Sequence, residues 1–262
     1  FGDVDISTSQ VTSTDNNVRI NGNLTSSTGG EFIFDDPTNT GNVALTLQGD
    51  DQTISGGGTY KFKRLFVRSG GTGARFEQDA TVEDLEGIDQ GSETLTVGNS
   101  ATLTVSGVNT GGVNGNLVIE GGSEFVLDAA NPLDVETVDV QSTGTLTLSN
   151  AGLKTAGLNV DGTLTLNGQA VTLDPASGET EQLGGTNLPT FADLEKSDGG
   201  TVELTSPVTV NGTLTLTNGD LDIQGNDLFL NGNLTQTGGA SGGTASSSGG
   251  SFTFQGSSTQ VL

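Results

Sequence analysis

The chain contains no Cys, His, Met or Trp among its 262 residues. Without Cys and His it can build neither disulfide bridges nor thiolate zinc sites, and it cannot assemble the Ser-His-Asp or Cys-His groups that activate nucleophiles. No apolar run approaches the roughly 20 residues that a helix needs to span a bilayer. We therefore expect no membrane insertion, and acid–base chemistry is left to carboxylates, Lys, Arg and the single Tyr60.

Basic residues are scarce, because 8 Lys and Arg stand against 32 Asp and Glu, for a formal net charge of −24. Such a surface repels nucleic acid and anionic lipid, so we expect neither as a partner. The acidity suits high salt, where self-repulsion is screened, or a surface that collects divalent cations. The alternative is simple solubility of an exposed protein.

One phrase recurs along the chain, a small polar turn followed by alternating Leu and Thr. Its copies are INGNLTS at 20–26, VNGNLVIEGG at 113–122, VDGTLTLNG at 160–168, VNGTLTLTNG at 210–219 and LNGNLTQTGG at 230–239. Asn-Gly or Asp-Gly is expected where the backbone needs positive φ, and the following segment has the period of two of a strand. Only 31% of residues are hydrophobic, which by itself is typical of disorder, but the strict alternation favours ordered structure.

Repetition of one strand–turn unit predicts a stacked, all-β fold, which we interpret as a right-handed parallel β-solenoid formed by a single domain over 1–262. The interval between the phrases at 210 and 230 is short, whereas the intervals from 113 to 160 and from 160 to 210 are more than twice as long. Coils of about 20–25 residues fit both kinds of interval, with the longer ones as two coils. The strand spacing then predicts roughly 10–13 coils and a rod of about 50–60 Å.

Two segments break the pattern. Residues 174–200 do not alternate, and FADLEKS after Pro189-Thr190 resembles a capped short helix. We expect an irregular excursion there that shields one face of a coil, with lateral docking as the alternative. Residues 238–250 are rich in Gly and Ser and are expected to form a loop.

The two ends of the chain carry related sequences. Residues 20–55 and 230–262 both pass from NGNLT through a Gly-rich turn to an F-x-F strand, and FGDVDIS at the start can serve as the continuation of the end. We see no polar or helical cap, so we expect uncapped ends that stack head to tail with further copies of the chain. The alternative is a fragment of a longer solenoid. The residues expected at this assembly interface are Phe1, Val4, Ile6, Phe252, Phe254, Val261 and Leu262.

Five of the eight basic residues fall within 15 positions, beside Tyr60, Phe62 and Phe66. In the simplest strand Tyr60, Phe62 and Arg64 share one side, and Lys61, Lys63 and Leu65 share the other. We expect a patch that docks an acidic neighbour and gives the assembly its polarity. A solvated strand edge with gatekeeping charges is the alternative. The patch adds Lys61, Lys63, Arg64 and Arg68 to the expected interface.

Adjacent carboxylates, Asp35-Asp36 and Asp50-Asp51, are the candidate ligands for a metal ion, which would be calcium because hard cations take oxygen ligands. The chain has no EF-hand spacing, and adjacent Asp pairs on turns are often simply solvated. GDDQ at 49–52 resembles part of the acidic motif of polygalacturonases, yet the His and Arg-Ile-Lys elements of that motif are missing. We therefore predict no enzyme and no required cofactor.

The runs VTVNGTLTLTNGDLDIQGNDLFLNGNLTQTGG at 208–239 and SFTFQGSSTQVL at 251–262 resemble the repeats of secreted surface proteins of Bacteroidota and their relatives. The resemblance implies an adhesin-like or filament-forming β-solenoid on the cell surface, without catalytic residues. The function expected is an extracellular structural protein, the subunit of a surface filament. The alternative is an adhesin segment that binds a glycan or a surface through its lateral face, and a polysaccharide-active enzyme ranks third.

Overall fold

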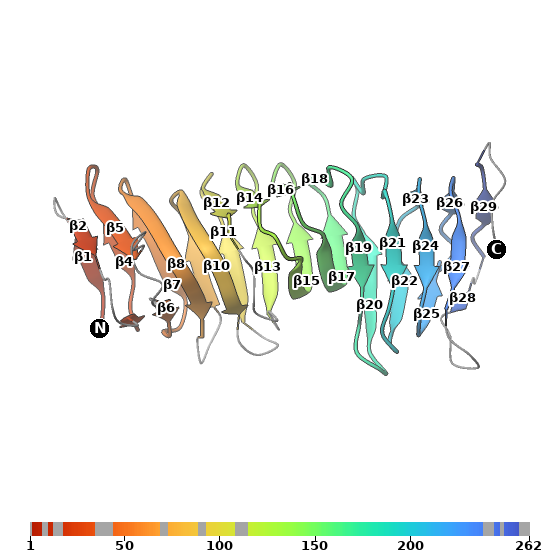
Figure 1. Ribbon diagram of the computed structural model, residues 1–262, viewed down its shortest axis with the longest axis horizontal. Helices are drawn as coiled ribbons and strands as arrows, with labels where there is room; N and C mark the ends of the chain where they lie inside the picture. The colour runs from red at the N-terminus through yellow and green to blue at the C-terminus, as the bar shows by residue number, and fades with distance from the viewer. Residues whose placement is uncertain are drawn as a thin grey trace.

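The computed structural model describes residues 2–6, 10–12, 18–34, 44–68, 73–88, 93–107, 115–237, 244–246 and 249–256. Throughout these ranges the chain forms short strands joined by turns, with no helix. Parallel strands stack in about 10 turns along one axis, which confirms the predicted β-solenoid. Figure 1 shows the resulting rod, with the first strands at one end and the last at the other.

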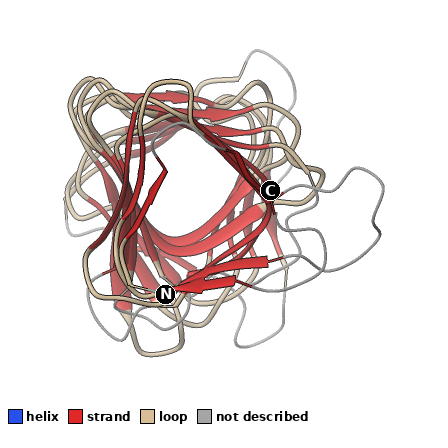
Figure 2. Cartoon of the chain, turned by 90° about the vertical axis from the view of Figure 1, so that its left-hand side faces the viewer, coloured by secondary structure: helices blue, strands red, loops and turns tan. Residues whose placement is uncertain are grey.

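Each turn of the solenoid crosses three faces in the same order, and the strands of one face pair in parallel from turn to turn. Figure 2 looks along the rod and shows these faces around a closed cross-section. Face 1 holds β1 (Val4–Ile6), β4 (Leu24–Ser26), β7 (Gln52–Gly56), β9 (Gly73–Phe76), β11 (Thr94–Val97), β13 (Asn116–Ile119), the end of β15 (Leu133–Val140), the end of β17 (Leu153–Val160), β20 (Thr180–Gly184), β22 (Thr201–Leu204), β25 (Asp220–Asp222) and β28 (Thr244–Ser246).

Faces 2 and 3 complete each turn. Face 2 holds β2 (Gln10–Thr12), β5 (Glu31–Phe34), the start of β8 (Thr59–Val67), the start of β10 (Ala80–Ile88), β12 (Thr102–Val105), β14 (Glu124–Leu127), β16 (Thr145–Leu148), β18 (Thr163–Thr165), β23 (Val208–Val210), β26 (Leu228–Leu230) and β29 (Phe252–Phe254). Face 3 holds β3 (Val18–Ile20), β6 (Ala44–Leu47), the ends of β8 and β10, the starts of β15 and β17, β19 (Val171–Leu173), β21 (Leu194–Lys196), β24 (Leu214–Leu216) and β27 (Leu234–Gln236).

The core is a set of apolar columns that run along the rod. On face 1, Leu117 pairs with Val138 and Val138 with Leu158, and all three side chains are buried. The steps from 117 to 138 and from 138 to 158 agree with the coil length that the sequence predicts. Each turn encloses the core with one strand on each of three faces. Because only every second side chain of a strand points inward, few residues per turn fill the core.

The faces meet at corners where two consecutive side chains point outward and the alternation of the strand restarts. The long strands β8, β10 and β15 each carry such a pair in the middle, at Lys63-Arg64, Glu83-Asp84 and Glu136-Thr137. At each pair the chain turns from one face to the next, and both side chains stay outside the core. This avoids burying an unpaired charge, which is strongly disfavoured. The corners therefore accommodate a second charged residue at a position that strict alternation would point inward.

The recurring phrase marks corners, but not one particular corner. Gly22 follows β3 and leads into face 1, Gly162 joins face 1 to face 2, and Gly212 joins face 2 to face 3. The two longer intervals between phrases are therefore not whole numbers of turns, whereas Val210 and Leu230 do pair on neighbouring turns. Positive φ, the expected reason for the glycine, was wrong for Gly22, Gly162, Gly212 and Gly232, whereas Gly168 and Gly219, which end two of the copies, do have positive φ.

The phrase needs glycine because successive turns approach closely at the corners. A Cβ on Gly162 would lie 2.3 Å from the carbonyl oxygen of Gly144, and a Cβ on Gly212 would lie 2.3 Å from that of Ala192. Neither distance is compatible with a side chain. The carbonyl of Gly144 instead accepts a hydrogen bond from the amide of Thr163, at 2.8 Å.

The expected excursion at 174–200 is a regular part of the stack, and the helix predicted there is absent. Within these described residues, β20 pairs with β17 and β22, β21 pairs with β19 and β24, and Phe191 bridges to Val210 with a fully buried side chain. The alternation in this segment is interrupted because turns, in which side chains do not alternate, lie between its inward-facing residues. The loop expected at 238–250 also contains a strand, β28, which pairs with β25, while 238–243 and 247–248 lie outside the described residues.

Candidate functional site

The last described turn of the solenoid consists of β28 on face 1 and β29 on face 2, after β27 on face 3. Each of these strands pairs with one described strand, β25, β26 and β24 respectively. No described strand pairs with the other edges of these three strands. Such an edge is a template for a further strand.

An aromatic pair occupies the inward positions of this last turn. Phe252 and Phe254 stack with their ring centroids 4.8 Å apart, over Leu228 and Leu230 of the turn before. Phe254 remains 41% exposed and is the one large apolar side chain that stays exposed among the described residues. The aromatic pair is therefore covered on one side by the turn before it and exposed on the other side.

Phe32 and Phe34 of β5 show what the covered arrangement looks like. They stack in the same way, with centroids 4.6 Å apart, and the next turn places Tyr60 and Phe62 against them. Both phenylalanines are then only 1% exposed. The F-x-F strand is thus a core element that is complete when another turn follows it.

The first turn presents the opposite end of the rod. Val4 is half-buried in β1, which pairs with β4, and β2 and β3 pair with β5 and β6. Among the described strands, these three have no further partner. Ile6 belongs to β1 by its backbone, whereas Phe1, Val261 and Leu262 of the predicted interface lie outside the described residues.

The basic strand is β8, and its side chains are not arranged as the sequence predicts. Tyr60, Phe62 and Leu65 are buried, whereas Lys63 and Arg64 both point outward. The prediction that Arg64 shares a side with Tyr60 was wrong, because the corner between faces 2 and 3 falls between Lys63 and Arg64. Burying the guanidinium would also cost far more than burying Leu.

The outward cations of β8 are held by carboxylates of the next turn. Lys63 forms an ion pair with Glu83, and Arg64 forms one with Glu86. Glu86 has a raised pKa because it is partly buried, and Arg64 opposes that rise. Since β8 lies between β5 and β6 on one side and β10 on the other, this strand is not part of either end of the rod.

Phe66 extends the basic cluster on face 3. The guanidinium carbons of Arg64 and Arg68 lie 5.5 and 4.7 Å from the centroid of the Phe66 ring, within the range of a cation–π interaction. Lys61, in contrast, is exposed on face 2. The predicted patch is therefore divided between two faces.

Ion pairs elsewhere also join turns, because Arg75 reaches Glu120 two turns further on and Lys154 pairs with the turns on either side of its own. Arg75 donates to both carboxylate oxygens of Glu120, at 2.5 Å each, and to Glu77 at 2.9 Å. This bidentate contact lowers the pKa of Glu120 and raises that of Arg75. Lys154 lies between Asp134 and Asp174, at 3.2 and 2.5 Å. The few basic residues thus offset repulsion between stacked acidic side chains.

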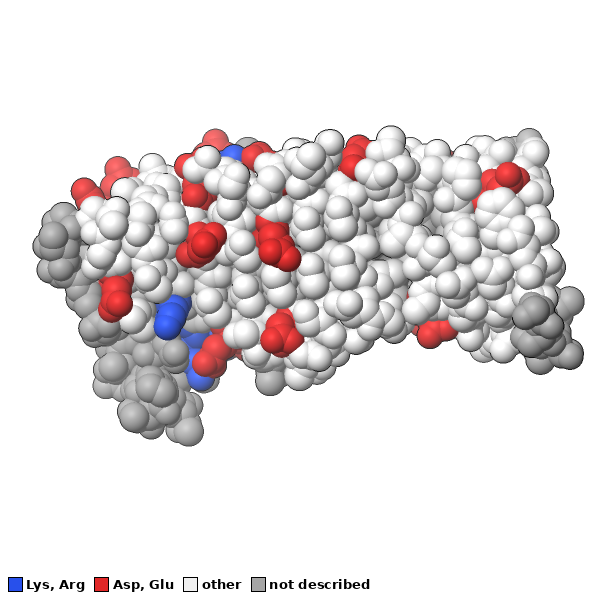
Figure 3. All heavy atoms as spheres, turned by 90° about the horizontal axis from the view of Figure 1, so that it is seen from above, with Lys and Arg blue, Asp and Glu red and all other residues white. Residues whose placement is uncertain are grey.

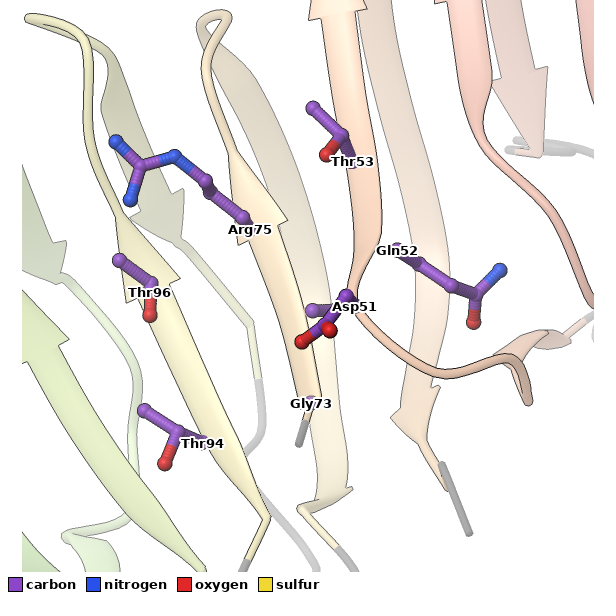
Figure 4. A pocket seen from close by; sticks show the side chains of 8 residues that line it. Asp51, Gln52, Thr53, Gly73, Arg75, Thr94 and Thr96 are labelled. Carbon is purple, nitrogen blue, oxygen red and sulfur yellow. The ribbon is translucent and has the colours of Figure 1, made fainter. Parts of the chain in front are cut away.

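Two of the four candidate metal ligands, Asp50 and Asp51, fall within the described residues. Asp50 and Asp51 are exposed on the turn before β7, and Asp35 and Asp36 lie outside the described residues. A hollow of about 280 Å³ lies beside Asp51. Figure 4 shows Arg75, Thr94 and Thr96 near it and the side chain of Gln52 pointing the other way. Across the described ranges, no group of three or more His, Cys, Asp or Glu is placed to hold a metal ion.

The flanks of the rod carry scattered charges. Figure 3 shows acidic side chains lying singly over the visible flank, with large uncharged areas between them and a few basic side chains toward one end. The described residues also include no helix of the length and apolarity that a membrane span requires. No protein-family model matches the sequence, and neither a curated protein nor a solved structure gives a significant match.

Sequence reasoning missed one inward cation. Lys196 occupies a core position of β21, is 1% exposed, and donates to the carbonyls of Asp198 and Asn218, the latter at 3.2 Å. Burial lowers its pKa, against the attraction of Asp198, Asp174 and Asp220. The only signal for this in the sequence is that Lys196 stands two positions after Leu194, which is the spacing of inward-facing residues in a strand.

Proposed function

We propose that the protein is an extracellular structural subunit that builds a surface filament by head-to-tail stacking of solenoid ends. The observation that carries the proposal is the contrast between two aromatic pairs. Phe32 and Phe34 are buried beneath the next turn, whereas Phe254 at the last described turn is 41% exposed. A second copy that supplies the next turn would remove this ring from water.

Stacking would extend the pattern already present inside the chain. In this proposal β1 of the incoming copy continues face 1 after β28, and β2 continues face 2 after β29. The parallel direction and the spacing of about 4.8 Å stay those of the internal turns. Because the two ends differ, the contact is heterologous and does not close on itself, which is the geometry of a filament.

Charge supports a dependence of this assembly on salt. Asp3 and Asp5 are exposed near the first turn, and Asp220 and Asp222 belong to β25, next to the last turn. With a net charge of −24, two copies repel each other strongly at low ionic strength. Filaments should therefore form more readily as salt rises, and the role requires no catalysis.

Negative-stain microscopy and light scattering of the purified chain at low and high salt, with and without calcium, test the proposal. We expect fibres of uniform width at high salt, and we expect Phe254→Asp to abolish them because it places a charge on the open aromatic pair. Phe229→Asp is the matched control, since Phe229 lies outward on face 2, one turn earlier. Monomers under all conditions, or unchanged fibres from Phe254→Asp, would overturn the proposal.

A further inference from the structure

Face 2 carries two straight rows of outward residues along consecutive turns. Strand register fixes the members of both rows, and most of them are Thr. The first row is Lys61, Thr81, Thr104, Val126, Thr147 and Thr165, and the second is Thr102, Glu124, Thr145 and Thr163. We call these residues the threonine rows.

The rows form a regular and rigid array of hydrogen-bonding groups. Neighbouring members of one row are about 4.8 Å apart along the rod, and the two rows are separated by about 6.6 Å along each strand. Each Thr hydroxyl provides one donor and two acceptor positions. Because Thr is β-branched, its χ1 angle is restricted, so little side-chain entropy is lost when a ligand binds.

A hollow of about 580 Å³ lies at the N-terminal end of the rows. Gly57 and Gly58 line it without side chains, and Lys61, Gln78 and Asp79 supply donors and acceptors of several kinds beside the first Thr residues of the rows. Asp79 is positioned there by the amide of Thr102, which donates to Oδ1 at 2.8 Å. The hollow thus offers a concave polar site continuous with the rows.

The charge of this surface differs from that of the whole molecule. The rows contain one cation, Lys61, and one anion, Glu124, and the hollow adds one further anion, Asp79, in a chain with a net charge of −24. Glu124 also accepts a hydrogen bond from the hydroxyl of Thr147, at 3.2 Å. A surface with so few charges fits an uncharged ligand, whereas a polyanion would be repelled by Asp79, Glu124 and the rest of the molecule.

We propose that the threonine rows and the hollow bind a neutral, extended polysaccharide of the β-1,4-linked type that lies along the axis of the rod. Hydroxyl groups on every sugar ring match a surface that repeats hydroxyl groups from turn to turn. The hollow would take one end of the bound segment and the rows the sugars that follow it. This site is on the flank and is independent of the stacking proposed for the ends.

Isothermal titration calorimetry with cellohexaose and mannohexaose tests the site, with hexagalacturonate as the anionic counterpart. The Phe254→Asp chain, which we expect to be monomeric, is used beside the unmodified protein, so failure of stacking and failure of sugar binding are distinguishable. We expect at least one neutral hexasaccharide to bind and hexagalacturonate not to bind.

Thr104→Val with Thr147→Val should weaken binding by about 10-fold, because it removes hydroxyls while keeping the β-branched shape. The matched control is Thr215→Val with Thr235→Val on face 3, paired with each other on neighbouring turns, which should leave binding unchanged. Absence of binding by both neutral chains, equal binding of hexagalacturonate, or equal loss in the control would overturn the inference.

Discussion

The carbonyl oxygen of Gly212 lies 1.9 Å from the position that a Cβ on Gly232 would occupy. The two glycines belong to successive copies of the recurring phrase, at the same corner of neighbouring turns. The Gly212 carbonyl accepts a hydrogen bond from the amide of Asn233, at 3.1 Å. The corner therefore places a backbone hydrogen bond where a side chain would otherwise stand.

Substitution of Gly232 by Ala should destabilise the solenoid. The methyl group cannot fit against the Gly212 carbonyl, so the corner must shift and strain or lose the hydrogen bond of Asn233. We expect a loss of at least about 2 kcal/mol in the free energy of unfolding, or a Tm lower by about 4–8 °C. Differential scanning calorimetry measures the shift.

Gly2→Ala is the matched control for this change, because a Cβ at Gly2 would meet nothing within 4 Å and its φ is not in the left-handed region. Its Tm should remain within the error of the unmodified chain. Equal stability of Gly232→Ala would show that the corner can open without cost, contrary to the steric reason for a glycine at this position.

Because Lys196 is buried, the free energy of unfolding should depend on pH in the alkaline range. Burial lowers its pKa below the ordinary value of 10.5, so the unfolded chain binds this proton more readily than the folded chain between those two values. Stability should therefore rise with pH in that window. Urea unfolding between pH 8 and 10 avoids Tyr60, whose pKa is raised to about 12 by burial and which acts above pH 10.

Lys196→Met should abolish this rise with pH. At pH 7 the change should alter the free energy of unfolding by less than about 2 kcal/mol, because relief from burying the charge opposes the loss of donors to two carbonyls. Lys154→Met is the control and should keep the rise, since hydrogen bonding to Asp174 raises the pKa of Lys154. If stability still rises with pH in Lys196→Met, another titrating group causes the rise.

Mild acid should stabilise the protein. Burial raises the pKa values of Glu181 and Glu136, and neighbouring carboxylates such as Glu179 raise them further. The folded chain then holds protons that the unfolded chain has lost, so stability falls as pH rises from the ordinary value of 4.5 through the raised values. We expect a higher Tm at pH 5 than at pH 7.

Glu181→Gln should raise Tm at pH 7 and reduce the gain on acidification, because it removes one of these carboxylates. Glu120→Gln should act in the opposite direction and cost less than about 1 kcal/mol at pH 7, since Arg75 lowers the pKa of Glu120. If Glu181→Gln lowers Tm at pH 7, burial of its charge is not the dominant effect.

Much of the fold follows from local patterns in the sequence. Alternating segments such as ETLTV at 93–97 and ATLTV at 101–105 predict strands with one buried side, and the structure buries Leu95, Val97, Leu103 and Val105. The pattern failed at corners, as in YKFKR, where two outward residues in succession restart the alternation. A period-two pattern carries no signal for such a corner until neighbouring turns are stacked.

The candidate sites were less predictable, because they depend on which residues of different turns become neighbours. The sequence places Lys63 and Arg64 in a basic run, but it does not indicate that Glu83 and Glu86 of the next turn pair with them. It likewise contains many Thr-x-Thr segments without showing that those at 102–104, 145–147 and 163–165 share one face.

The length of a turn also varies along the rod. Val4 pairs with Leu24 on the next turn, and Leu24 pairs with Ile54 on the turn after that, so the second of these turns is half as long again as the first. The alignment of residues between turns therefore cannot be counted from a fixed period.

The sequence by itself determined the class of fold and the chemistry that is absent, because period-two alternation, repeated glycine corners and the lack of Cys and His are local properties. Tertiary structure decided which glycine carbonyls meet, which acidic and basic side chains pair, and that Phe254 is exposed while Phe34 is buried. The physical reason is that each turn buries its inward residues against the turns beside it. An inward residue is therefore covered or exposed according to its position in the stack, which its local sequence does not encode.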